Sequence, residues 1–296
     1  MGALAGANVF IGVYRRAAGR LPFRCAVQGV SCSFDIRDII KILFSLNMKS
    51  LTEVKAVLAG ILLTFALAPL TPHAQELNPS LGADSGLTAA QIVSEMRDHN
   101  LVRAAALKHF HSVRHYSVEY RGFSAKIAAQ MEVEADYDVV SGKTFRIVSQ
   151  SGSKLLIDKV LKRLVESEAD AQKQHSSDLT AANYKFRLDG TDHVAGRPAY
   201  VLEVEPLTDD KYLYRGKIWV DAADFALARI EASPAKSPSF WISSTAIHHR
   251  YEKTGSFWLP AQNESDTDVR VGGRAVLRID YGTYEVAPLA PMVGGN

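Results

Sequence analysis

Residues 131–139 read Met-Glu-Val-Glu-Ala-Asp-Tyr-Asp-Val and set the fold class, because apolar and acidic side chains alternate without a break. Alternate side chains of a β-strand point to opposite faces, so this pattern predicts a strand with one buried and one solvated face. Similar period-two patterns recur between residues 184 and 286, separated by turn signals such as Asp189-Gly190.

Two helical segments interrupt these strands. The first, over residues 88–108, opens with Thr88 and Gln91 at the spacing of a capping box, and the second covers residues 154–175. No strand–helix–strand alternation indicates a parallel sheet. We therefore predict a mainly β protein with helices (α+β), in which about eleven strands form an incomplete, strongly curved antiparallel β-barrel covered by helices.

The first 74 residues differ from the rest in charge. Eight basic and three acidic residues lie before residue 75, so the totals of 34 and 32 leave 26 basic and 29 acidic residues after it. From Met48 the sequence reads as a secretory signal peptide: Lys49 and Lys55, an apolar run over 56–68, and a proline-bearing end with cleavage near Ala74. An uncleaved N-terminal anchor is the alternative.

Four segments follow from this pattern. Residues 1–47 are an extension that precedes the true start codon at Met48, or an organelle transit peptide. Residues 48–74 are the signal peptide, 75–87 a flexible lead-in, and 88–290 a single β-domain. Both cysteines, Cys25 and Cys32, lie in the extension. We therefore expect an exported, soluble, periplasmic protein without a disulfide, a reactive thiol or a lipid anchor.

The sequence lacks the usual signatures of catalysis and of cofactor binding. It has no nucleophile elbow, no phosphate-binding loop and no dinucleotide fingerprint. His111 and His115 are better explained as surface or hydrogen-bonded residues than as metal ligands, and so are His248 and His249. The acidic balance after residue 74 disfavours nucleic acid. We therefore expect no enzymatic activity, no cofactor, no metal and no nucleic-acid partner.

Two clusters of charged residues are better explained as solvated surfaces than as binding sites. The acidic residues of 131–139 share one strand face. They could form a cation site, but we favour the interpretation that this face is the solvated outer side of the sheet. The second helical segment carries a charged run that we interpret as a solvated helix face. That run consists of Lys159, Lys162, Arg163, Glu166, Glu168 and Asp170.

Aromatic residues gather late in the sequence. All three tryptophans, Trp219, Trp241 and Trp258, fall within one stretch of strands. Most of them suit core packing, but a half-open barrel has more inward surface than its own side chains fill. Strand alternation predicts inward-facing, cavity-lining side chains at Met131, Val133, Tyr137, Tyr200, Leu202, Trp219 and Leu277, with Ile92 and Met96 on the covering helix.

The hairpin formed by residues 217–221 and 225–231, Lys-Ile-Trp-Val-Asp and Phe-Ala-Leu-Ala-Arg-Ile-Glu, resembles the central hairpin of the outer-membrane lipoprotein-sorting superfamily. The order of elements over about residues 88–287 is also similar, and the further motifs that carry the resemblance are Asp189-Gly190, Gly196-Arg197-Pro198, Tyr200-Val201-Leu202 and Phe257-Trp258-Leu259-Pro260. That superfamily includes the periplasmic lipoprotein carrier, its outer-membrane receptor and a regulator that binds an anti-sigma factor. The carrier's lid-fastening arginine stands in a Lys-Arg-Pro triplet that this sequence lacks, so its role is not transferred.

The resemblance implies a periplasmic carrier or sensor that reversibly binds a lipid or the acyl chains of a lipoprotein in an apolar cavity, in lipoprotein sorting to the outer membrane. We expect this protein to be a monomer. Its partners would be the acylated client and a membrane protein for delivery or reception. The alternative is a protein-interaction module that regulates an envelope stress response through an anti-sigma factor.

Overall fold

The computed structural model describes residues 86–122, 126–169, 178–210, 213–237, 240, 242–270 and 272–289. The predicted extension, signal peptide and cleavage site lie outside these residues, as do Trp241 and all of the lead-in except Gly86 and Leu87. No helix in the described ranges is long and apolar enough to cross a membrane.

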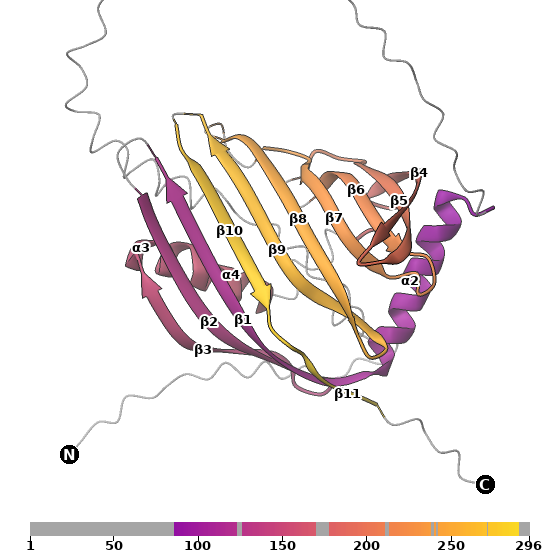
Figure 1. Cartoon of the computed structure of the whole chain (residues 1–296), viewed down its shortest axis with the longest axis horizontal. Coiled ribbons are helices and arrows are strands. Elements are labelled where there is room, and N and C mark those ends of the chain that lie inside the picture. The colour runs from indigo at the N-terminus through magenta and orange to yellow at the C-terminus, as the bar shows by residue number, and fades with distance from the viewer. Residues whose placement is uncertain are drawn as a thin grey trace, which may run out of the picture.

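One antiparallel sheet dominates the molecule (Figure 1). Its strands follow the order β3-β2-β1-β10-β9-β8-β7-β6-β5-β4, and β11 pairs with the beginning of β1. The strands are β1 Leu107–Arg121, β2 Lys126–Asp138, β3 Gly142–Gly152, β4 Tyr184–Val194, β5 Arg197–Pro206, β6 Tyr214–Asp221, β7 Leu227–Pro234, β8 Ile242–Thr254, β9 Phe257–Val269, β10 Arg274–Tyr281 and β11 Glu285–Pro288. Because β3 and β4 are the two edges of this order, the barrel is not closed, which confirms the predicted fold class.

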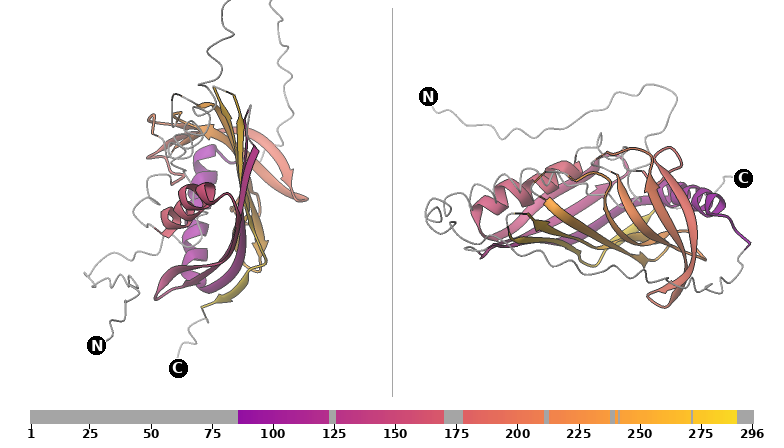
Figure 2. Two further views of the ribbon diagram at one scale, coloured as in Figure 1. Left: turned by 90° about the vertical axis from the view of Figure 1, so that its left-hand side faces the viewer. Right: turned by 90° about the horizontal axis from the view of Figure 1, so that it is seen from above.

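Two helical segments lie on the same side of the curved sheet (Figure 2). The first is α2, Ala89–Ala106, whose N-terminus carries the predicted capping box between Thr88 and Gln91. The second, which we call the inserted helix, consists of α3 Lys154–Leu156, the π-helical turn η2 Ile157–Leu161 and α4 Lys162–Ala169. A π-helical turn is uncommon within a helix and is frequent at functional sites.

The first strand begins earlier than the sequence pattern suggested. We expected the first helix to reach residue 108 and strand character to begin near Tyr116, but α2 ends at Ala106 and β1 starts at Leu107. The reason is packing at this end of the sheet. Leu107 and Phe110 are fully or almost fully buried there, in a cluster with Tyr284.

Candidate functional site

Two apolar clusters lie between the sheet and the helices, one under each helix. The inserted-helix cluster joins the inserted helix to β1, β2 and β10, and its buried members are Tyr116, Val118, Tyr120, Ala129, Met131, Val133, Leu156, Ile157, Val160, Leu161, Leu164, Val165, Ala275, Leu277 and Ile279. The α2 cluster joins α2 to β4–β9 and includes Ile92, Val93, Met96, Tyr200, Leu202, Ile218, Ile230, Tyr251 and Trp258. The concave face is therefore apolar in two separate regions.

The structure divides the predicted ligand-binding residues between these regions. Met131, Val133 and Leu277 meet in the inserted-helix cluster. Tyr200 and Leu202 meet Ile92 and Met96 in the α2 cluster. Tyr137 belongs to neither region. Its ring stacks on that of Phe110, with centroids 5.5 Å apart, beside the separate cluster that Leu107 and Phe110 form with Tyr284.

Trp219 corrects one of these predictions. It pairs with Val201 in the register of β5 and β6, so it lies on the face opposite to Tyr200 and Leu202. Its indole is still buried, because the Arg229 guanidinium covers the ring at 3.8 Å from the centroid. The indole Nε1–H donates a hydrogen bond of 2.9 Å to Asp192. The predicted alternation was out of phase by one residue on this strand, since Ile218 and not Trp219 faces the α2 cluster.

A buried ionic network fastens the inserted helix to the sheet. Arg114 Nη1, on β1, lies 2.9 Å and 2.8 Å from the two carboxylate oxygens of Glu168 on α4. Lys143 Nζ, on β3, donates to the same carboxylate at 3.0 Å. The side chains of Arg114 and Glu168 are 2% and 3% exposed. The prediction of a solvated face was therefore wrong for Glu168.

The network is ionised despite its burial. Burial alone would raise the pKa of Glu168, but the charges of Lys143 and Arg114 lower that pKa to about 2. The Arg114 guanidinium also lies 4.8 Å from the ring centroid of Tyr281 and 5.4 Å from that of Phe145. These aromatic faces offset part of the cost of removing the cation from water.

A second arginine fastens α2. Arg103, in its last turn, donates from Nη1 to the backbone oxygen of Asp224 at 2.7 Å and from Nη2 to that of Phe225 at 3.0 Å. The receiving turn, between β6 and β7, is itself fixed because Asp224 accepts from Lys253 and from Trp258 at 2.7 Å and 2.9 Å. Each helix is thus held to the sheet by one partly or fully buried arginine.

The acidic face of β2 contributes cross-strand pairs. Asp136 lies 2.8 Å from His111 Nδ1, and Glu134 pairs with Arg146. Asp138 accepts the backbone N–H of Val140 at 2.8 Å in the turn to β3. Within the described ranges, no three His, Cys, Asp or Glu side chains gather in a way that could hold a metal ion.

A groove interrupts the outer face where β7 and β8 separate. Their residues pair only from Arg229–Arg250 to Ala232–Ile247. Beyond that point β7 stays paired with β6 as far as Pro234, and β8 stays paired with β9. Pro234 has no N–H that could bond to β8. The groove in this split has a volume of about 480 Å³.

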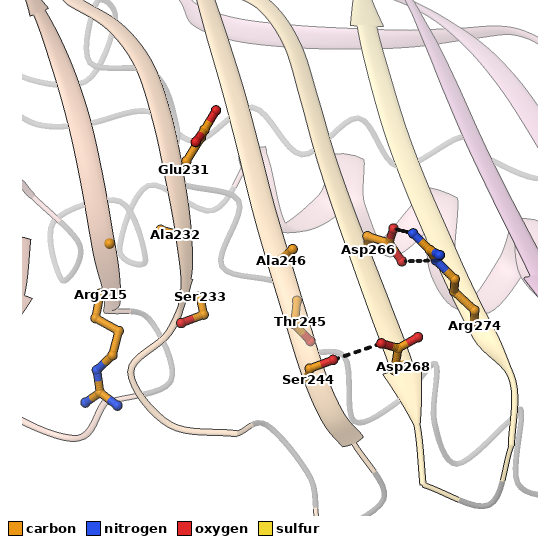
Figure 3. A pocket seen from close by; sticks show the side chains of 11 residues that line it. Arg215, Glu231, Ala232, Ser233, Ser244, Thr245, Ala246, Asp266, Asp268 and Arg274 are labelled. Carbon is orange, nitrogen blue, oxygen red and sulfur yellow. Dashed lines mark hydrogen bonds and ion pairs between the residues drawn. The ribbon is translucent and has the colours of Figure 1, made fainter. Parts of the chain in front are cut away.

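Polar side chains line this groove (Figure 3). Ser244 donates to Asp268 at 3.0 Å, and Arg274 pairs with Asp266 on the neighbouring strand. These residues alternate along the strands with the buried Thr245 and so face away from the helices. The groove contains none of the predicted ligand-binding residues.

A family model described as the MucB/RseB N-terminal domain matches residues 155–232, which run from the inserted helix into β7. No curated protein matches the chain. Similar solved structures include a DUF1329 family protein from Desulfovibrio piger, with 14% identity, a TM-score of 0.37, and coverage of 71% of this chain and 96% of that one.

Two further structures are similar at the same level. A LolA superfamily protein from Nitrosomonas europaea has 11% identity, a TM-score of 0.31, and coverage of 69% of this chain and 96% of its own. The MucA/MucB complex of Pseudomonas aeruginosa has 12% identity, a TM-score of 0.25, and coverage of 67% and 94%. The family match over residues 155–232 confirms the resemblance of this chain to the superfamily of lipoprotein-sorting proteins and their regulatory relatives.

Proposed function

We propose that this protein is a non-enzymatic periplasmic carrier that reversibly binds the acyl chains of a lipid or lipoprotein between its sheet and its inserted helix. The observation that carries the proposal is the construction of the inserted-helix cluster. Its roof is a helical segment with a π-helical turn, attached to the sheet through side chains and not through strand pairing. A roof of this kind can move without breaking the sheet.

An acyl chain would take the place of the helix side chains in this cluster. Met131, Val133 and Leu277 supply the sheet side of the site, and Leu156 and Val160 lie on the roof. Each methylene that leaves water contributes about 0.8 kcal/mol, which offsets the lost packing of the displaced roof. Binding of this kind needs no covalent chemistry, no cofactor and no metal.

The network of Arg114, Glu168 and Lys143 then decides when the roof is closed. A buried pair is costly to separate but gains back solvation once both groups reach water. The state in which the inserted helix packs on the sheet therefore competes with ligand binding. A membrane protein that receives the lipid or lipoprotein could release it by stabilising that packed state. The carrier would act as a monomer and deliver its ligand to this membrane protein.

The proposal is tested on protein purified from the periplasm. Native mass spectrometry should show a bound lipid or acylated client, and a fluorescent fatty-acid probe should bind saturably and be displaced by unlabelled lipid. Protein that carries no lipid after purification and takes up no probe would contradict the proposal.

The groove between β7 and β8 favours a second function, that of a protein-interaction module in an envelope stress response. An extended peptide can add to an unpaired strand edge, and the edge of β8 toward β7 has no ladder partner over 242–246 among the described residues. An anti-sigma factor would be the partner. Ala246→Arg, which fills the groove, should abolish co-purification of that factor, whereas Val140→Arg at a distant exposed turn should not. Equal capture by both variants would count against this function.

A further inference from the structure

One row of neighbouring side chains crosses the concave face from strand to strand. Residues paired in register from β7 to β2 are Ile230, His249, Asn263, Ile279, Tyr116 and Met131. Ile230 belongs to the α2 cluster, and Ile279 belongs to the inserted-helix cluster. His249 and Asn263 are thus a polar pair between the two apolar regions.

Both members of this pair are buried and incompletely hydrogen-bonded. Each residue is 5% exposed. His249 Nδ1 and Asn263 Oδ1 have no hydrogen-bond partner among the described residues, while Asn263 Nδ2 donates to the Tyr281 hydroxyl at 3.0 Å. Turning the amide over would exchange the two atoms and still leave one without a partner. A buried polar atom in this condition costs about 1–3 kcal/mol.

The polar pair carries no formal charge. Burial lowers the pKa of His249 to about 4, so the imidazole is neutral near pH 7. Arg114 lies over the ring of Tyr281, whose hydroxyl bonds to Asn263. The charge of this arginine is already paired with Glu168. A neutral imidazole and an amide offer both a donor and an acceptor, which suits an uncharged polar group and not a carboxylate.

We propose that His249 and Asn263 bind the uncharged polar end of the acyl ligand, a glyceryl ester or hydroxyl group, while its chain occupies the inserted-helix cluster. The inference rests on the proposed carrier function and adds a preference among its ligands. The register places Asn263 beside Ile279, so a ligand whose chain lies in that cluster can present its polar end to the pair. A ligand hydroxyl can donate to Asn263 Oδ1, the acceptor that lacks a partner. An ester carbonyl can only accept, and it would bond to His249 in the tautomer that carries its proton on Nδ1.

The test uses three competitors with chains of equal length, 1-monooleoylglycerol, oleyl alcohol and oleate, displacing a fluorescent acyl probe from the purified protein. The two uncharged lipids should displace the probe at concentrations about tenfold lower than oleate, the advantage expected for one additional net hydrogen bond. In His249→Leu and Asn263→Leu that advantage should fall below about twofold. Ser265→Ala, on the same face of β9, is the matched control and should keep it.

The outcomes separate the two claims. Equal displacement by all three lipids in the unmodified protein would overturn the inference and leave the carrier function standing. Water, and not the ligand, would then satisfy the hydrogen bonds of the polar pair. A preference for uncharged lipids that survives in both leucine variants would also overturn it. Failure of the unmodified protein to bind the probe would overturn the carrier function and the inference together. Apolar replacement of a buried, unsatisfied pair is compatible with folding, and thermal unfolding of each variant verifies this.

Discussion

Arg114 and Glu168 are 54 residues apart in the sequence, yet Arg114 Nη1 lies within 2.9 Å of both carboxylate oxygens of Glu168. This pair joins β1 to α4 across the inserted-helix cluster. It is the most deeply buried ion pair among the described residues for which exposures are given. One buried charged contact, supported by Lys143, therefore adds to the apolar packing that holds the inserted helix over the sheet.

Replacing Glu168 by glutamine should destabilise the protein strongly. The change leaves two cations, Arg114 and Lys143, facing a neutral amide in a buried place. Breaking one side of a buried pair costs about 3–5 kcal/mol. Urea unfolding measures the loss, and hydrogen exchange should show faster exchange in residues 154–169.

The double variant Arg114→Leu, Glu168→Leu is the informative comparison. It removes both charges, and the Lys143 side chain, 16% exposed, can turn toward solvent. We expect it to be more stable than Glu168→Gln alone. A double variant that is less stable than the single one would show that the network itself, and not the unpaired charge, carries the stability.

His249 makes stability depend on pH in a defined interval. Its pKa is lowered to about 4 in the folded protein by burial, so below its ordinary value of 6.5 the unfolded chain binds a proton that the folded protein does not. Stability should therefore fall as the pH drops from about 6.5 to 4, by about 3 kcal/mol at most. Urea unfolding of His249→Leu should lack this fall. A matching decline in the variant would assign the effect to another group.

Gly216 should not tolerate a side chain. Its φ is +152°, and a Cβ there would lie 2.2 Å from the backbone oxygen of Glu231 and 2.6 Å from Cα of Ala232. Gly216→Ala should therefore cost more than about 2 kcal/mol through separation of β6 from β7. Gly142→Ala is the matched control, because its φ is +81° but nothing lies within 4 Å. Equal thermal unfolding temperatures in both variants would show that the strands adapt.

Arg103 should hold the end of α2 without defining the fold. Arg103→Met keeps most of the side-chain volume but loses the bonds to the Asp224 and Phe225 carbonyls, at an expected cost of about 1–3 kcal/mol. Hydrogen exchange should quicken in α2 and not in β8–β10. Arg97→Met is the matched control, because the exposed Arg97 side chain pairs with its neighbour Asp98. It should change neither the stability nor the exchange rate of α2.

Local patterns predicted most of the fold. Period-two alternation located β2 with its buried Met131 and Val133, and the capping box located the start of α2. Trp219 was misplaced because the alternation on this strand was taken one residue out of phase: Ile218 and Val220 face the helices, and Trp219 faces the other way. A shift of one residue reverses every side chain of a strand.

Long-range polar contacts were the part that the sequence concealed. Glu168 stands in a charged run that is typical of a solvated helix, and nothing near it identifies Arg114 as its partner. One signal was available: Arg114 shares strand parity with Tyr116 and Val118, and an inward-facing arginine requires a buried counter-charge. The separation of β7 from β8 has a weaker signal in Pro234.

The central claim, acyl binding between the sheet and the inserted helix, is tested most directly by photo-crosslinking. A fatty-acyl probe with a diazirine in its chain is irradiated with the purified protein, and adducts are mapped to single residues by mass spectrometry. The account predicts saturable adducts on the inserted-helix cluster, at Met131, Val133, Leu156, Val160 or Leu277, that unlabelled lipid suppresses. Adducts confined to the outer groove around Ala246, or labelling that does not saturate, would contradict it.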